Sequence, residues 1–108
     1  MIEKILQYQT PDGRIPFREW LLGLTDIRSR AAVRTRLDRL LLGNMGDCKA
    51  VGAGVFELRF HFGPGYRVYF ALDRGAIVIL LCGGDKHHQE RDIRRAQSFW
   101  KDYLRRKR

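Results

Sequence analysis

Side chains that suit proton transfer or phosphate binding gather in one stretch of the chain, residues 57–87. They are Glu57, Arg59, His61, Arg67, Tyr69, Lys86 and His87. Histidine titrates near neutral pH and therefore suits proton transfer, whereas arginine can bind phosphate oxygens through two parallel N–H groups. A surface that combines them could bind and act on a phosphate-bearing substrate. The alternative is the ordinary solvated face of an antiparallel sheet, on which charged pairs are common.

Two neighbouring strands are predicted to position most of these side chains. Residues 55–62 alternate apolar and polar side chains, which predicts a half-buried strand with its charged residues on one face. Residues 63–65, Gly-Pro-Gly, predict a turn into a second strand over residues 66–72. Arg59 and Arg67 then fall on the same face of neighbouring strands, where they can bracket a phosphate group.

A third strand is predicted over residues 76–82, after a hairpin at Asp73-Arg74-Gly75. Its continuously apolar sequence indicates a strand that is covered on both faces. It ends in Gly83-Gly84-Asp85-Lys86, which brings Lys86 and His87 next to the polar side chains of the other two strands.

The remaining segments complete an α+β order of β-α-α-β-β-β-α. An edge strand is predicted over residues 2–9, a short amphipathic helix over 16–23, a second helix with an apolar stripe over 26–42, and a last helix over 88–106. Residues 43–54 are rich in glycine and are predicted to be irregular. We therefore expect an antiparallel sheet with an N-terminal helical hairpin and a C-terminal helix, with the helices on one face.

The charge of the chain predicts a polyanionic partner. At 108 residues with a net charge of +9, residues 1–108 are expected to form one strongly basic domain. Nucleic acid is the first candidate partner, an acidic protein the second and a membrane surface the third. Arg91, Arg94 and Arg95 are predicted to face outward from the last helix, and Lys49 to lie at the rim of a site. A basic surface kept for solubility is the alternative.

Several other classes of function lack support in the sequence. No apolar run approaches the length of a membrane span, and the N-terminus lacks the features of a signal peptide, so we expect a cytoplasmic protein. Cys48 and Cys82 are expected to be free thiols. The pair His87-His88 has no second cluster of metal ligands, and we expect neither a metal nor a cofactor.

Two longer segments carry a resemblance to a known family. They are ELRFHFGPGYRVYF at 57–70 and ILLCGGDKHHQERDIRRAQSFW at 79–100. In their order and spacing the chain resembles the RelE/ParE superfamily of toxins, and within it the HigB-like, phage Gp49-like group of addiction module killer proteins. The resemblance implies a RelE-like fold and an endoribonuclease that cuts translated mRNA on the ribosome without a metal. It also implies a cognate antitoxin, a helix-turn-helix protein encoded by the adjacent gene.

Cleavage without a metal uses the 2′-hydroxyl of the RNA as nucleophile and requires a base, an acid and positive charge at the phosphate. Arg59, Arg67 and Lys86 match the basic residues of the family. His61 and Glu57 are the candidate bases, His87 is a candidate acid, and Tyr69 is a candidate for stacking on a base or donating a proton. Two alternatives remain open, because the superfamily also contains inhibitors of DNA gyrase, and a plain RNA-binding module would share the same charge.

Overall fold

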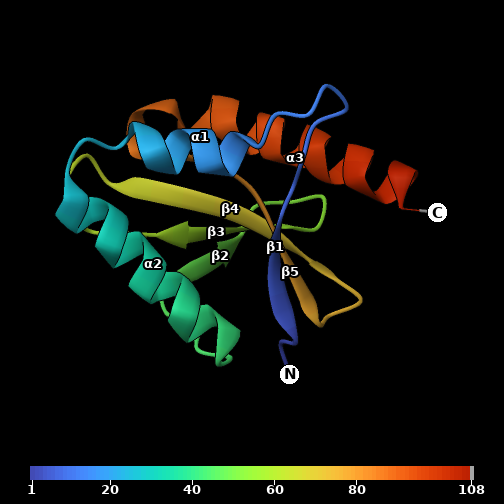
Figure 1. Cartoon of the computed structure of the whole chain (residues 1–108), viewed down its shortest axis with the longest axis horizontal. Coiled ribbons are helices and arrows are strands. Elements are labelled where there is room, and N and C mark those ends of the chain that lie inside the picture. The colour runs from blue at the N-terminus through green and yellow to red at the C-terminus, as the bar shows by residue number, and fades with distance from the viewer. Residues whose placement is uncertain (108) are drawn as a thin grey trace.

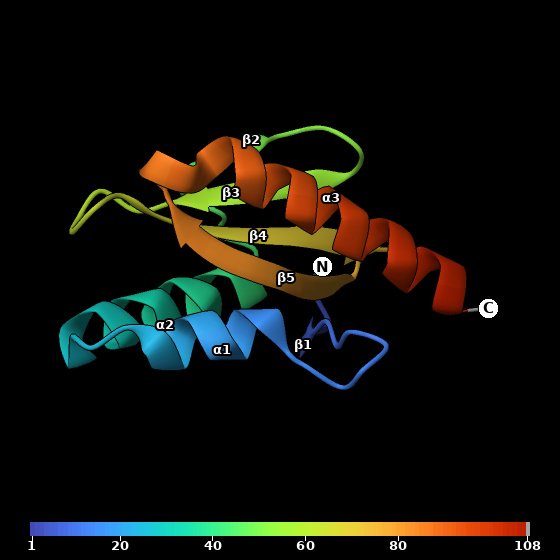
Figure 2. The same ribbon diagram turned by 90° about the horizontal axis from the view of Figure 1, so that it is seen from above.

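The computed structural model describes residues 1–107 and contains a five-stranded sheet with helices on both faces (Figures 1 and 2). Its elements are β1 (Lys4–Gln7), α1 (Pro16–Gly23), α2 (Ile27–Leu41), β2 (Cys48–Ala50), β3 (Val55–Arg59), β4 (Tyr66–Asp73), β5 (Ile77–Asp85), a 3₁₀ turn (Lys86–His88) and α3 (Gln89–Arg106). The strands lie in the order β1-β5-β4-β3-β2. No helix within residues 1–107 is long and apolar enough to cross a membrane.

The sheet is mixed, so the prediction of a wholly antiparallel sheet is wrong. β2, β3, β4 and β5 pair in antiparallel fashion, but β1 runs parallel to β5, with Lys4 opposite Ile77. The predicted order also lacked β2, because residues 43–54 were expected to be irregular. β2 pairs Cys48 with Leu58 of β3. A strand of three residues is too short to show a period of two, and the glycines around it indicated a loop.

Helices pack on both faces of the sheet, so the prediction that they cover one face is also wrong (Figure 2). On one face, Phe17 of α1 and Val33 of α2 pack in a cluster that includes Leu58 and Phe70. On the other face, α3 packs its own apolar side chains against the sheet. That second cluster includes Ala96, Trp100, Val55, Tyr69 and Ala71. The predicted coverage of the third strand on both faces is confirmed, because β5 contributes to both clusters.

The helix boundaries agree closely with the sequence prediction. α1 begins at Pro16, whose fixed φ suits a first helical turn. α2 is capped by Asp26, whose carboxylate accepts a hydrogen bond from the backbone N–H of Arg28 at 2.9 Å. Asp85 caps the turn before α3 in the same way, by accepting from the N–H of His87 at 2.9 Å.

The pair Gly83-Gly84 lets both helical layers approach β5 closely. A Cβ atom on Gly83 would lie 2.1 Å from the ring of Trp20 in α1. On the opposite face, a Cβ atom on Gly84 would lie 2.0 Å from the carboxylate of Asp92 in α3. Only glycine provides this room. The pair therefore fixes the position of the strand end from which Lys86 projects.

Asp102 joins the C-terminal half of α3 to the chain after β1. Its carboxylate accepts hydrogen bonds from the hydroxyl of Tyr8 at 2.6 Å and from Arg105 and Arg106 at 2.8 Å. The hydrogen bond from Tyr8, followed by that from Arg106, lowers the pKa of Asp102 from an ordinary value of 3.8 to about 2. Because the pKa is lowered in the folded state, the stabilisation is present above pH 3.8 and is lost as the pH falls towards about 2.

We expect Asp102→Asn to lower the free energy of unfolding at neutral pH and to flatten its dependence on pH between about 4 and about 2. Denaturant unfolding at a series of pH values measures both effects. Tyr8→Phe removes the hydrogen bond from the Tyr8 hydroxyl to Asp102. It should also flatten the dependence of the free energy of unfolding on pH, by a smaller amount. A slope that is the same in Asp102→Asn as in the unaltered chain would contradict this role.

Candidate active site

Three of the predicted site residues line one pocket of about 220 Å³. His61 follows β3, Arg67 lies in β4 and Lys86 follows β5, and the rest of the wall is Phe60, Gly63 and Gly65. The turn between β3 and β4 is tied to the end of β5, because the backbone N–H of Lys86 donates to the carbonyl of Gly65 at 3.0 Å. The pocket thus combines two cations that can hold a phosphate with an imidazole that can move a proton.

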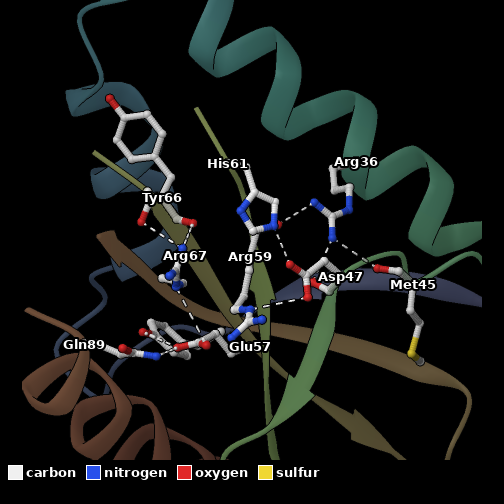
Figure 3. Close-up of polar contacts among 11 residues, drawn as sticks. Arg36, Met45, Asp47, Glu57, Arg59, His61, Tyr66, Arg67 and Gln89 are labelled. Atoms are coloured by element: carbon white, nitrogen blue, oxygen red, sulfur yellow. Dashed lines mark hydrogen bonds and ion pairs between the residues drawn. The ribbon is translucent and has the colours of Figure 1, made fainter. Parts of the chain in front are cut away.

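Arg67 is held in place from two sides (Figure 3). Its Nη1 donates to the backbone carbonyls of Gly65 and Tyr66, each at 3.1 Å. Its Nε lies 3.8 Å from Oε1 of Glu57, and only 12% of the Arg67 side chain is exposed. Arg67 therefore presents a fixed positive charge to the pocket.

Glu57 and Tyr69 are both fully buried under α3, which corrects the expectation that they lie on a solvated face. Oε2 of Glu57 accepts hydrogen bonds from the hydroxyl of Tyr69 at 3.0 Å and from Nε2 of Gln89 at 2.8 Å. Burial, followed by the charge and the hydrogen bond of Glu57, raises the pKa of Tyr69 far above its usual range. A ring in this position neither stacks on an RNA base nor readily gives up its proton. Glu57 is placed as the counter-charge of Arg67 rather than as a base that RNA can reach.

Arg59 does not share the pocket with Arg67, although the two residues are paired across β3 and β4. Its Nε donates to Oδ1 of Asp47 at 3.3 Å, and Nε2 of His61 lies 2.5 Å from Oδ2 of the same carboxylate. Asp47 comes directly before β2. Arg59 and His61 are therefore linked through one acidic side chain (Figure 3).

A second hollow, of about 490 Å³, adjoins the first because Lys86 lines both. Its wall carries His87, Arg91 and Arg94, all of them exposed, as was predicted for the two arginines. Arg95 lies apart, with its guanidinium 5.5 Å from the centre of the Phe99 ring and 3.4 Å from Asp92. Lys49 is exposed on β2, opposite Glu57 in the neighbouring strand.

Sequence reasoning missed three residues of this region, namely Arg36, Asp47 and Gln89. Arg36 is one of five arginines on α2, and nothing in their spacing indicated which of them would hydrogen-bond to residues of the site. Asp47 lay in a segment that was expected to be irregular. Gln89 opens α3, and its contact with Glu57 became apparent only once α3 was placed over that face of the sheet. Within residues 1–107 no three His, Cys, Asp or Glu side chains come close enough together to hold a metal ion.

Comparison with known proteins identifies the family. A family model described as phage-derived protein Gp49-like (DUF891) matches residues 19–101, a range that contains the whole of the site described above. A protein of Haemophilus influenzae described as uncharacterized is 48% identical over 83 residues, which cover 77% of this chain and 84% of that protein. No solved structure matches the chain. The chain belongs to the family of phage-derived Gp49-like proteins.

Proposed function

We propose that this chain is the toxin of a toxin–antitoxin module and that it cleaves mRNA on translating ribosomes without a metal ion. The family is associated with addiction-module toxins, which supports the first part of the proposal. The observation that carries the second part is the pocket in which His61, Arg67 and Lys86 meet. A protein that only blocks another macromolecule has no need of a pocket of this composition.

The proposed reaction uses the RNA as its own nucleophile. The 2′-hydroxyl oxygen attacks the neighbouring phosphorus, the bond from phosphorus to the 5′-oxygen breaks, and the products are a 2′,3′-cyclic phosphate and a 5′-hydroxyl. Arg67 and Lys86 stabilise the charge that develops on the non-bridging oxygens. His61 accepts the proton of the 2′-hydroxyl, and His87 is the candidate that returns a proton to the leaving oxygen.

The second hollow supplies a path for the rest of the RNA. Lys86 belongs to both hollows, and Arg91 and Arg94 follow it along α3 at positions that can contact successive phosphates. A cognate antitoxin of the helix-turn-helix type would neutralise the toxin, and the basic surface of this chain suits an acidic segment of such a partner.

Induced expression in a bacterial host tests the proposal, with mapping of mRNA 5′ ends and of plasmid supercoiling in the same cells. We expect growth arrest with new mRNA ends confined to translated regions and with supercoiling unchanged. Arrest with loss of supercoiling and intact mRNA would instead indicate inhibition of gyrase. RNA binding without arrest or cleavage would indicate a plain binding module, and either result would overturn the proposal.

A further inference from the structure

Asp47 contacts His61 directly and has no part of its own in the proposed reaction. Oδ2 of Asp47 is 2.5 Å from Nε2 of His61, and the two residues are fourteen positions apart in the chain. We propose that Asp47 is a positioning residue, which orients the ring of His61 and holds it in one tautomer for proton transfer. This inference rests on the proposed nuclease function, of which it specifies one component.

The backbone at Asp47 is tied to α2. Arg36 donates from Nη2 to the backbone carbonyl of Asp47 at 2.9 Å and from Nη1 to that of Arg59 at 2.8 Å. Its guanidinium also lies 4.9 Å from the centre of the Phe60 ring. One arginine thus connects the segment before β2 to the end of β3 (Figure 3). A base that must be aimed benefits from a partner that is fixed in this way.

The chemistry of the contact selects one tautomer of the imidazole. The hydrogen bond with His61, together with the charge of Arg59, lowers the pKa of Asp47, so its carboxylate is ionised at neutral pH. An ionised carboxylate accepts hydrogen bonds and cannot donate them. In neutral His61 the proton must therefore lie on Nε2, and the lone pair must lie on Nδ1, which points away from Asp47 (Figure 3).

The charged groups around His61 fit a ring that is held by Asp47 at Nε2 and accepts a proton at Nδ1. Asp47 is the acidic group in contact with it, and that carboxylate is shared with Arg59. Arg67 and Lys86 line the same pocket. Lys86 is exposed and lines the pocket, and Arg67 lines it too although it is paired with Glu57, whereas Arg59 is engaged by Asp47 and does not line the pocket. In a serine protease triad an aspartate also holds the histidine, but it does so through Nδ1 and leaves Nε2 as the base. Here the carboxylate contacts Nε2, so Nδ1 would accept the proton of a hydroxyl that belongs to the RNA.

A double-mutant cycle tests the inference through single-turnover cleavage of ribosome-bound mRNA. Asp47→Asn should slow cleavage at least about tenfold at saturating mRNA, and His61→Ala by about 10²- to 10⁴-fold. If Asp47 acts through His61, Asp47→Asn should cause no further loss in the His61→Ala background. An equal loss in both backgrounds, or no loss in either, would overturn the inference. Asp38→Asn removes the same charge from an exposed position on α2 and serves as the control.

Long-range ¹H–¹⁵N NMR of the isolated chain tests the same pair without any nuclease assay. Above the ordinary titration range of histidine, His61 should be a single Nε2–H tautomer in the unaltered chain. Asn can donate as well as accept, so Asp47→Asn should give a mixture of tautomers. Equal tautomer populations in the two proteins would overturn the inference. Absence of cleavage by the unaltered chain would overturn the proposed function and leave the NMR result to decide the role of Asp47.

Discussion

Replacing Lys86 with alanine should slow single-turnover cleavage of ribosome-bound mRNA by about 10²- to 10³-fold, the usual loss when one group that stabilises transition-state charge is removed. Lys86 lies in both hollows and is exposed on the turn between β5 and α3. Because exposed substitutions normally change stability little, the loss should appear in the rate and not in the unfolding curve. Lys86→Arg keeps the charge and should recover part of the rate.

Lys4→Ala is the matched control for that experiment. Lys4 is also an exposed lysine, but it lies opposite Ile77 at the far end of β5. It should leave the rate unchanged, because its charge is remote from the pocket. Equal cleavage rates for Lys86→Ala and the unaltered chain would show that Lys86 has no role in cleavage. Equal losses for Lys86→Ala and Lys4→Ala would mean that only the overall charge matters.

Replacing Glu57 with alanine should lower the free energy of unfolding by about 3–5 kcal/mol, because it leaves a nearly buried arginine without its counter-charge. Arg67 is 12% exposed and faces Oε1 of Glu57, whereas Oε2 holds Tyr69 and Gln89. All three partners would lose a contact at once. Chemical denaturation followed by circular dichroism measures the change.

Glu57→Gln separates this structural role from the catalytic role that the sequence suggested. The amide keeps the shape of the side chain and one acceptor oxygen, so the protein should fold with a smaller loss of stability. If Glu57 is only the counter-charge of Arg67, the folded variant should cleave mRNA within about tenfold of the unaltered rate. A loss of about 10²-fold or more at full folding, the range for removal of a general base, would restore Glu57 as the base.

Periodicity and turn chemistry predicted the parts of the fold that depend on local sequence. α1 begins and ends where the pattern placed it, β3 and β4 follow the alternation of their side chains, and β5 follows the continuous apolar run. The direction of β1 could not be predicted, because four residues at the sheet edge carry no information on which way they pair. β2 was missed for a similar reason, since three residues cannot establish a period.

Strand order brings three of the candidate residues together but leaves Arg59 outside their pocket, and the burial of Glu57 and Tyr69 was not predicted. Neighbouring strands bring His61, Arg67 and Lys86 together, as their positions in the sequence indicated. Glu57 and Tyr69 share the polar register of that face, but α3 covers them. Their alternation with apolar residues is the same whether water or a helix lies above, so the sequence pattern could not distinguish the two environments.

The measurement that tests the nuclease most directly is the chemistry of the cut ends. The purified chain is added to ribosomes that translate a defined mRNA, with a copy that lacks the start codon as the control. We predict cuts in the translated message alone, with a 2′,3′-cyclic phosphate on the upstream fragment and a 5′-hydroxyl on the downstream one. Cuts that leave a 5′-phosphate, cuts that appear without translation, or an intact message would contradict the proposed function.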